Sequence, residues 1–382
     1  MNTSRHFPGR LGLLQRVLPA YRAPFFNALA AACTDGLSVF AGQPARDEAI
    51  QTTEKLEVAQ FFPARNLHLG RVGSPFYLCW QGRLTRWLDA WQPDALIVEA
   101  NPRYLSTRLA CSWMHARQRP VLGWGLGAPQ GKGSLETLRK PGRARFLSQF
   151  DGMIAYSQRG AEEYRAYGFP AEKVFVAPNA AAPRPSAPPQ ERPPAFGERP
   201  IVLFVGRLQR RKRIDNLLRA CSALPVESQP EVWIVGAGPA MEEFQALARP
   251  VYPRAQFHGA RHAAELEPYF SRADLFVLPG TGGLAVQEAM AYGLPVIVAE
   301  GDGTQDDLVR PENGWRVPPG DLEALTRTLQ DALSDASRLR RMGRQSYRIV
   351  AEEANLERMV EVFINAVGSL QSGVSRRDNP QS

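Results

Sequence analysis

Residues 273–298, ADLFVLPGTGGLAVQEAMAYGLPVIV, constrain the fold of this 382-residue chain more than any other segment. The apolar run 274–278 predicts a buried strand, and a glycine-rich loop, a helix and a second strand over 295–298 follow it. The loop glycines are Gly280, Gly282 and Gly283. Glycines between a strand and a helix let backbone N–H groups approach a ligand closely, and the helix N-terminus adds partial positive charge. The loop therefore favours an anion site, most often for phosphate, although glycine turns also serve plain α/β packing.

Glu288 lies on the predicted helix that follows these glycines. A carboxylate at this position could accept hydrogen bonds from a sugar diol. A phosphate-binding loop beside such a carboxylate would form a nucleotide or nucleotide-sugar site.

The C-terminal half repeats the same order of short apolar runs and amphipathic helical patterns. Its predicted strands span 201–206, 231–236, 255–258, 274–278 and 295–298. Its predicted helices span 214–224, 240–248, 264–271 and 284–292. This βαβα order predicts a parallel sheet covered on both faces, with ligands bound beyond the carboxyl ends of its strands.

The N-terminal half alternates less cleanly but in the same sense. Its predicted strands span 11–15, 37–41, 95–99, 121–124, 153–156 and 174–177. Its predicted helices span 24–32, 77–91, 105–117 and 159–167. The chain is long enough for two α/β domains, and a cleft between two domains is a favoured place for a ligand.

A proline-rich run over 178–200 marks the boundary between the halves, because prolines at this density cannot join a sheet or a helix interior. The predicted division is an N-terminal domain, a linker, a C-terminal domain, a helix and a disordered polar tail, with the bounds 1–180, 181–200, 201–350, 351–370 and 371–382. The predicted C-terminal helix either caps the C-terminal domain or returns to the N-terminal domain, and periodicity leaves both open.

Composition indicates a soluble globular enzyme, with 44% apolar and 22% charged residues. The net charge of +8 suits anionic partners or a solvated basic surface, but the basic residues are too widely spread to favour nucleic acid. The cysteines form no CxxC pair and are typical of a reducing compartment. No stretch has the length of a membrane span, and the start lacks the apolar core of a signal peptide. We expect a cytoplasmic protein that could contact the inner face of the plasma membrane.

Two cations follow the first strand of the C-terminal half, in the run VGRLQRRKRIDNLL. Arg207 lies at the strand end after Gly206, and Lys212 lies five residues further on at a helix start. Such a pair can clamp a diphosphate, Arg through its planar fork and Lys as a point charge. A solvated basic turn is the alternative.

The run VGAGPAMEEF follows the next strand and begins like a dinucleotide fingerprint. Met241 takes the place of the third glycine, so the full pattern fails. Gly236 and Gly238 still permit a tight turn beside a flat ligand such as a nucleotide base.

Two further stretches bear on membrane contact. The basic segment 131–145 could face anionic lipid headgroups or a phosphorylated acceptor, although a solvated loop is favoured. The stretch SPFYLCWQGRLTRWLDAW, from Ser74, interleaves aromatic and basic residues, and its aromatic residues are expected mainly in the core.

Several chemistries are disfavoured by missing motifs. The sequence has no HExxH, no metal-spaced Cys/His set, no GxSxG elbow, no GxxxxGK[ST] loop and no Asp-x-Asp pair. Metal-dependent hydrolysis, serine esterase chemistry, P-loop ATP hydrolysis and metal-dependent glycosyl transfer are therefore not expected, nor is a bound metal or cofactor.

Together, these C-terminal signals resemble the family 4 retaining glycosyltransferases of the GT-B fold, over roughly 201–333. The matching runs are FVGRLQRRKRIDNLL, VWIVGAGPAMEEF, FHGA, ADLFVLPG, QEAMAYGLPVIV and DLVRPENGW. The N-terminal half is similar in architecture and in the fragment IAYSQRGAEEYRAYGFPAEKVFVAPN. The resemblance implies two Rossmann-like domains with parallel sheets facing across a central cleft.

The resemblance also implies roles for individual residues. Arg207 and Lys212 would bind the donor diphosphate, and Glu288 would bind the ribose hydroxyls. The amides near Leu284 and Ala285 would contact phosphate. Donor-binding glycines would be Gly206, Gly236, Gly238, Gly280, Gly282 and Gly283, the second and third lying near the base.

The sequence departs from the family pattern at three places. Family members usually carry a glutamate at the position of Gly280, where it contacts the donor sugar. Many carry a histidine where this chain has GWGLG, from Gly123. The usual glycine-rich acceptor loop is replaced by LPAYRAPFF, from Leu18.

The sequence therefore predicts a metal-independent, retaining hexosyltransferase. It would move a sugar from a nucleotide-diphosphate donor to a polysaccharide or lipid-linked acceptor, in cell-envelope or exopolysaccharide synthesis. The alternatives are a non-catalytic sugar-nucleotide-binding protein, which the lost glutamate and histidine favour, and another GT-B activity such as nucleotide-sugar epimerisation.

Overall fold

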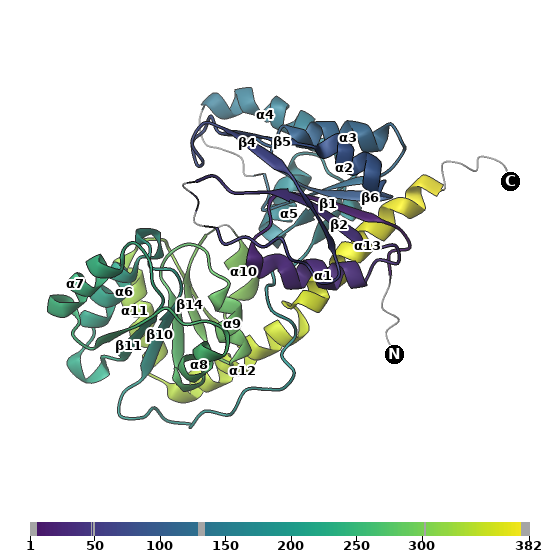
Figure 1. Cartoon of the computed structure of the whole chain (residues 1–382). Coiled ribbons are helices and arrows are strands. Elements are labelled where there is room, and N and C mark those ends of the chain that lie inside the picture. Colours follow the sequence, from purple (N-terminus) through teal and green to yellow (C-terminus); the bar gives the residue numbers. More distant parts are fainter. Residues whose placement is uncertain (1–5, 47, 49, 129–133, 302, 376–382) are drawn as a thin grey trace. The chain divides into compact units, whose positions relative to one another are not determined.

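The computed structural model describes residues 6–46, 48, 50–128, 134–301 and 303–375. They form two α/β units (Figure 1). Unit 1 comprises the chain up to Ala181 together with the chain from Leu356, and unit 2 comprises Ala182–Asn355.

Unit 1 is built on a seven-stranded sheet in the order β3-β2-β1-β6-β7-β8-β9, in which all neighbours are parallel. Its strands are β1 (Leu11–Val17), β2 (Leu37–Gly42), β3 (Gln60–Pro63), β6 (Ala95–Glu99), β7 (Val121–Gly125), β8 (Gly152–Ala155) and β9 (Val174–Val176). A separate antiparallel hairpin joins β4 (Arg65–Leu69) to β5 (Leu78–Gly82).

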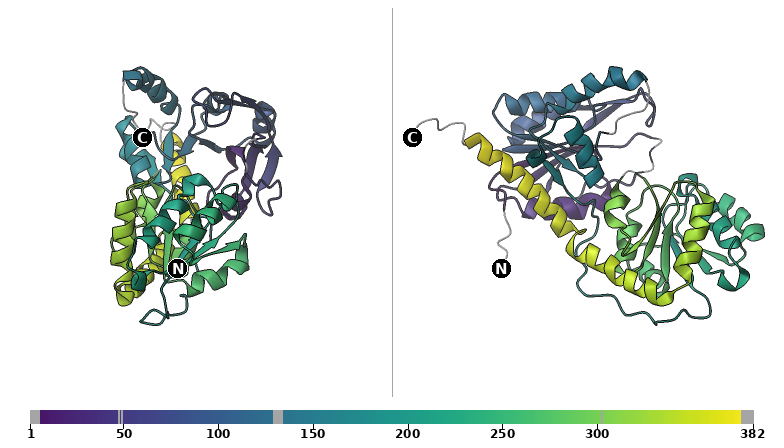
Figure 2. Two further views of the ribbon diagram at one scale, coloured as in Figure 1. Left: turned by 90° about the vertical axis from the view of Figure 1, so that its left-hand side faces the viewer. Right: turned by 180° about the vertical axis from the view of Figure 1, so that it is seen from behind.

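Helices cover both faces of this sheet. Side chains of α1 (Ala23–Ala31) and α13 (Leu356–Ser375) join one apolar core, and α13 lies against α1, β8 and β9 (Figures 1 and 2). The other core contains residues of α2 (Leu84–Trp91), α3 (Ser106–His115), α4 (Ser134–Leu147) and α5 (Gln158–Ala166). Strand residues divide between the cores because neighbouring side chains point to opposite faces, as Leu13 and Leu14 of β1 do.

Unit 2 contains a six-stranded parallel sheet in the order β12-β11-β10-β13-β14-β15. Its strands are β10 (Ile201–Val205), β11 (Glu231–Val235), β12 (Ala255–Gly259), β13 (Leu275–Leu278), β14 (Val296–Ala299) and β15 (Gly314–Val317). Its helices are α6 (Ile214–Ser222), α7 (Met241–Val251), α8 (Glu267–Arg272), α9 (Ala285–Ala291), α10 (Thr304–Leu308), α11 (Leu322–Leu333) and α12 (Ala336–Glu352). In Figure 1, α6, α7 and α11 lie on one face of the sheet and α8, α9 and α12 on the other.

The predicted α/β fold with two parallel sheets is confirmed. The helix predicted over 77–91 is wrong in its first part, because Leu78–Gly82 is a strand. Its side chains alternate between the two faces of the hairpin, and Arg83 adopts a left-handed conformation that separates β5 from α2. Sequence analysis also missed β3, the hairpin strand β4, α4, α10, β15 and the pair α11 and α12.

The proline-rich segment has no regular structure where it joins unit 2, but one side chain attaches it to that unit. The guanidinium of Arg192 donates to the backbone oxygens of Phe270, Ala273 and Tyr292 at 2.7, 2.8 and 2.8 Å. Burial, with the charge of Arg340, lowers the pKa of Arg192 to about 10. These bonds hold the segment against the C-terminal ends of α8 and α9.

The C-terminal elements differ from their predicted bounds. Residues 353–355 separate α12 from α13 and interrupt the helix that was predicted over 351–370. Helix α13 continues to Ser375. The four cysteines are buried and unpaired.

Candidate functional site

Three loops of unit 2 meet at the carboxyl ends of adjacent strands, since β10 lies between β11 and β13. The loop after β10 contains the short 3-10 helix Arg210–Lys212. Its Arg211 carbonyl accepts a hydrogen bond of 3.2 Å from the Thr281 amide, in the loop after β13. On the other side, the Leu208 amide donates to the Ala237 carbonyl at 3.0 Å. The basic and glycine-rich motifs predicted after these three strands therefore lie side by side along one edge of the sheet.

Lys212 is buried between the loops after β10 and β13, with 5% of its surface exposed. Its ammonium donates to the carbonyl oxygen of Thr281 at 2.8 Å and also to that of Gly282. Burial, assisted by the charge of Arg211, lowers the pKa of Lys212 to about 8. A cation held only by carbonyl oxygens keeps its charge available to an anion.

Gly280 is buried where the two loops touch. A Cβ at this position would overlap the Arg211 carbonyl oxygen and lie 2.6 Å from the Lys212 Cα. Any larger residue would push the two loops apart. The glycine that replaces the expected glutamate therefore has a packing reason in this chain.

Gly236 and Gly238 have a similar role in the loop after β11. A Cβ on Gly236 would lie 2.9 Å from the Gly206 carbonyl carbon, and one on Gly238 would lie 2.7 Å from the Leu208 amide. These two glycines thus let the loop after β11 pack against the loop after β10. Arg207, in the latter loop, has an exposed side chain.

Glu288 lies on α9, which begins at Ala285, directly after Leu284 at the end of the glycine loop. Its side chain is half-buried, and within the described part of the chain it has no ion-pair partner. Burial raises the pKa of this carboxyl. The carboxylate is therefore free to accept hydrogen bonds from a ligand.

The structure thus brings together Lys212 and the three loop glycines Gly280, Gly282 and Gly283. Gly206, Gly236 and Gly238 lie at the neighbouring loop contact. Sequence reasoning found all these residues because each follows a recognisable strand.

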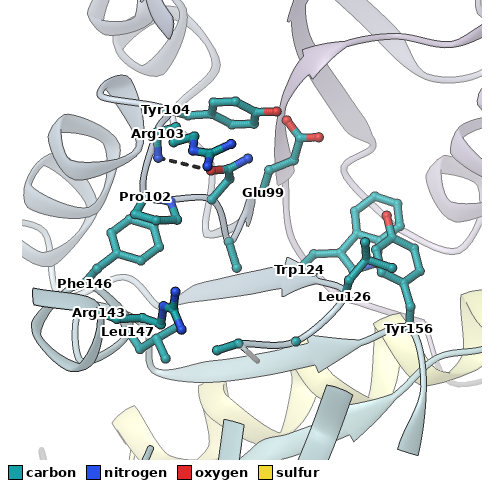
Figure 3. Close-up of a pocket in the computed structure, with 15 residues that line it drawn as sticks. Glu99, Pro102, Arg103, Tyr104, Trp124, Leu126, Arg143, Phe146, Leu147 and Tyr156 are labelled. Carbon is teal, nitrogen blue, oxygen red and sulfur yellow. Dashed lines mark hydrogen bonds between the residues drawn. The ribbon is translucent and has the colours of Figure 1, made fainter. Parts of the chain in front are cut away.

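Sequence reasoning missed a cavity in unit 1. It has a volume of about 420 Å³ and lies beyond the carboxyl ends of β6 and β7 (Figure 3). Glu99, at the end of β6, and the last four residues of the GWGLG run, 124–127, line part of it. The sequence signal that could have indicated this cavity was Glu99, a polar residue at the end of a predicted strand.

The described residues contain neither a metal-binding cluster nor a helix that could span a membrane. No group of three or more His, Cys, Asp or Glu side chains there could hold a metal ion. None of the described helices has both the length and the apolar character required to cross a membrane. The basic segment 131–145 lies partly outside the described residues, which resume at Ser134.

Comparison with known families matches most of the chain. Residues 189–349 match the family described as glycosyl transferases group 1. Residues 20–180 match the glycosyl transferase 4-like domain.

Curated relatives include glycosyltransferases of envelope glycans. The lipopolysaccharide core biosynthesis glycosyltransferase LpsE of Rhizobium meliloti is 23% identical over 300 residues, which are 73% of this chain and 87% of LpsE. A GDP-mannose-dependent alpha-mannosyltransferase of Mycobacterium tuberculosis is 34% identical over 163 residues, or 42% of this chain. The match spans only 39% of that mannosyltransferase.

Solved structures with a similar fold cover nearly the whole chain. Sucrose-phosphate synthase from Thermosynechococcus elongatus aligns with a TM-score of 0.69 and 20% identity, over 95% of this chain and 99% of its own. The Anabaena protein HepE in complex with UDP-glucose aligns with a TM-score of 0.60 and 16% identity, over 95% of this chain and 100% of its own. The chain therefore belongs to family 4 of the glycosyltransferases, enzymes of the GT-B fold that transfer a sugar from a nucleotide-sugar donor.

Proposed function

We propose that unit 2 binds the nucleotide diphosphate of the donor at the edge formed by the loops after β10, β11 and β13. The observation that supports this most is the Lys212 ammonium, which is buried, positively charged below its lowered pKa and held by carbonyl oxygens of the glycine loop. Arg207 adds a second, exposed cation. The amides of Leu284 and Ala285 add hydrogen-bond donors, and no metal is required.

The charges suit the departure of a diphosphate. When the bond between the sugar C1 and the phosphate oxygen breaks, negative charge develops on the leaving group. Fixed cations and amides stabilise that charge more than they stabilise the intact donor, so they accelerate the reaction. Glu288 accepts hydrogen bonds from the ribose hydroxyls, and the loop that contains Gly236 and Gly238 lies near the base.

The transfer retains the anomeric configuration by front-side displacement. The acceptor oxygen forms its bond to C1 on the face from which the phosphate leaves, and the acceptor proton passes to the leaving phosphate oxygen. This route needs no protein nucleophile. Gly280 supports it, because no carboxylate can be accommodated at that position without moving the Arg211 carbonyl.

The acceptor is a polysaccharide or a lipid-linked glycan, reached by peripheral contact with an anionic bilayer. The hairpin of β4 and β5 supports this contact. One of its faces exposes Leu67 (47%), Leu69 (54%) and Trp80 (36%), and Phe76 beside it is 84% exposed. Arg65 lies on the same face of β4. Exposed apolar side chains next to a cation are typical of surfaces that enter a headgroup layer.

A nucleotide-sugar panel tests the proposal. The folded protein should be stabilised against heat by the matching donor and by its nucleoside diphosphate, because neither binds the unfolded chain. Lys212→Ala and Glu288→Ala should lose that stabilisation and lose sugar transfer. A donor converted to another nucleotide sugar without acceptor would indicate epimerisation, and binding without any turnover would indicate a non-catalytic protein.

A further inference from the structure

A second cavity lies in unit 2, away from the loops after β10, β11 and β13. It has a volume of about 360 Å³, and residues before and within β15 line it together with residues from the first turns of α12. Pro311 and Glu312 precede β15, and the strands of this sheet are parallel. The cavity therefore lies toward the amino ends of the strands, opposite the edge that we assign to the diphosphate.

Trp315 provides an aromatic wall for this second cavity. The Arg338 guanidinium lies 5.5 Å from the centre of the Trp315 ring. Asp331 holds that guanidinium in place, with its Oδ2 at 3.0 Å from Nη2. Trp315 is partly exposed, and Met342 adds apolar surface to the lining. A flat ring that is fixed from behind and open to a cavity can pack against the apolar face of a sugar ring.

Three exposed arginines form a row along α12, and the row begins at the second cavity. Arg341, Arg344 and Arg348 are spaced by three and four residues, so they project from one face of the helix. Arg341 also lines the cavity. Within the described part of the chain, none of the three side chains has a hydrogen bond or an ion pair. At a rise of about 1.5 Å per residue, the row is about 10 Å long.

The surface around this arginine row is mainly positive. Glu312 is the acidic side chain among the residues that line the cavity, and it interacts with the charge of Arg310. Glu352 is exposed in the last turn of α12. The three unpaired arginines outnumber these two carboxylates, so the surface favours an anionic partner. A bilayer is flat and places no ring inside a hollow, so the cavity favours a chain molecule over a lipid surface.

We propose that the second cavity and the arginine row bind an acidic oligosaccharide chain at a non-catalytic site. One sugar ring packs against Trp315, and the Gln345 amide, which lines the cavity and has no partner among the described residues, bonds to a hydroxyl. Arg341, Arg344 and Arg348 contact carboxylate or phosphate groups along the chain, because the guanidinium fork matches both anions. The site holds a glycan on the enzyme. This holding role rests on the proposed function, whereas the affinity for the acidic chain does not.

Calorimetry on the full-length protein tests the proposal with two matched pairs of saccharides. One pair is hexagalacturonate and its uncharged methyl ester, and the other is phosphorylated dextran and dextran. We expect the charged member of at least one pair to bind at least about tenfold more tightly, which is the effect of a charge-assisted hydrogen bond. That pair identifies the anionic group as carboxylate or phosphate. Equal binding within both pairs, or no binding of either charged saccharide, overturns the proposal.

Matched double variants locate the binding. Arg341→Gln combined with Arg344→Gln should weaken the charged saccharide at least about tenfold. Arg219→Gln combined with Arg249→Gln is the control. It removes two exposed arginines of α6 and α7 whose side chains also lack a described partner, so the change in net charge is the same. The control should bind like the parent. Equal loss in the two double variants would show attraction by net charge alone and overturns the proposal.

Three further measurements separate this site from its alternatives. Trp315→Leu should also weaken the charged saccharide, and unchanged binding would rule out the cavity. The Arg341→Gln and Arg344→Gln double variant should keep the thermal stabilisation by the nucleoside diphosphate, because it lies away from that site. If the parent lacks this stabilisation but binds the saccharide, only the donor assignment fails. If the double variant loses binding to phosphatidylglycerol vesicles and the parent binds no saccharide, the surface contacts membranes and the proposal is overturned.

Discussion

The Lys212 ammonium donates a hydrogen bond of 2.8 Å to the carbonyl oxygen of Thr281, and this bond joins the loop after β10 to the loop after β13. The two strands are neighbours in the sheet, although Lys212 and Thr281 are 69 residues apart in the sequence. The bond places a cation at the glycine loop before any ligand arrives. The site is therefore preorganised for the charge of a diphosphate.

Binding of the nucleoside diphosphate should depend on the protonation of Lys212. Its pKa is lowered to about 8, so the ammonium is charged at neutral pH and loses its proton as the pH rises. We expect the affinity for the nucleoside diphosphate that stabilises the protein in the donor panel to fall above pH 8, approaching about tenfold per pH unit. Isothermal titration calorimetry between pH 7 and about 9.5 measures this. Lys212→Met should bind weakly with a flat profile, and a steep profile in that variant would assign the titration elsewhere.

Gly280→Glu should damage the protein rather than restore a family feature. The new Cβ would overlap the Arg211 carbonyl oxygen, and overpacking of this kind costs about 1–3 kcal/mol of unfolding free energy. Urea denaturation measures the loss, and binding of the nucleoside diphosphate should weaken with it because Lys212 is displaced. Gly197→Ala, where a Cβ meets nothing within 4 Å, is the control and should change stability little. A stable and more active Gly280→Glu variant would refute the packing explanation.

The sequence could predict the parallel strands of both units but not all of the site. Strands such as β13 and β14 are continuous apolar runs bounded by glycine or proline, and this local signal survives without tertiary information. The strand β5 was wrongly predicted as helix because the alternation of buried and exposed residues in it is brief and leads directly into the amphipathic helix α2. The packing role of Gly280 depends on the Arg211 carbonyl, which is far away in the sequence. The spacing of residues within a motif cannot predict such a contact.

The cavity of unit 1 was beyond prediction for a related reason. Glu99, Trp124 and Arg143 come from β6, β7 and α4, and only the sheet order brings them together. The helix that carries Arg143 was itself missed, since its segment reads as a solvated basic loop. By contrast, Lys212 and Glu288 lie within runs that resemble the family, so they could be named at once.

Glu99 should make the stability of the protein depend on pH. Burial raises its pKa to about 7, against the opposing charges of Arg16 and Arg22, and the hydroxyls of Tyr104 and Tyr156 are nearby. Because this pKa lies above the unfolded value, the stabilising contribution is complete below about pH 4.5 and is lost as the pH rises to about 7.

Urea denaturation from pH 5 to about 8 compares the parent protein with Glu99→Gln. The difference in unfolding free energy should change by roughly 1–3 kcal/mol over this range, in favour of the variant at high pH. Glu48 is the control, because its pKa is lowered by its bond to Arg16. The cost of Glu48→Gln should therefore be complete by about pH 5 and stay nearly constant over this range. A constant difference for Glu99→Gln would show that the carboxyl titrates normally.

The exposed hairpin of β4 and β5 should determine binding to vesicles. Leu67 lies opposite Trp80 in the antiparallel register, so the two form one apolar pair on the exposed face. Trp80→Ser combined with Phe76→Ser removes two large apolar contacts, and we expect about a tenfold or greater loss of binding to vesicles of phosphatidylglycerol and phosphatidylcholine. Cosedimentation measures it. Leu322→Ser, an exposed apolar position of unit 2 (37%), is the control and should bind like the parent. Equal binding of the hairpin variant and the parent would exclude the hairpin as the surface that binds vesicles.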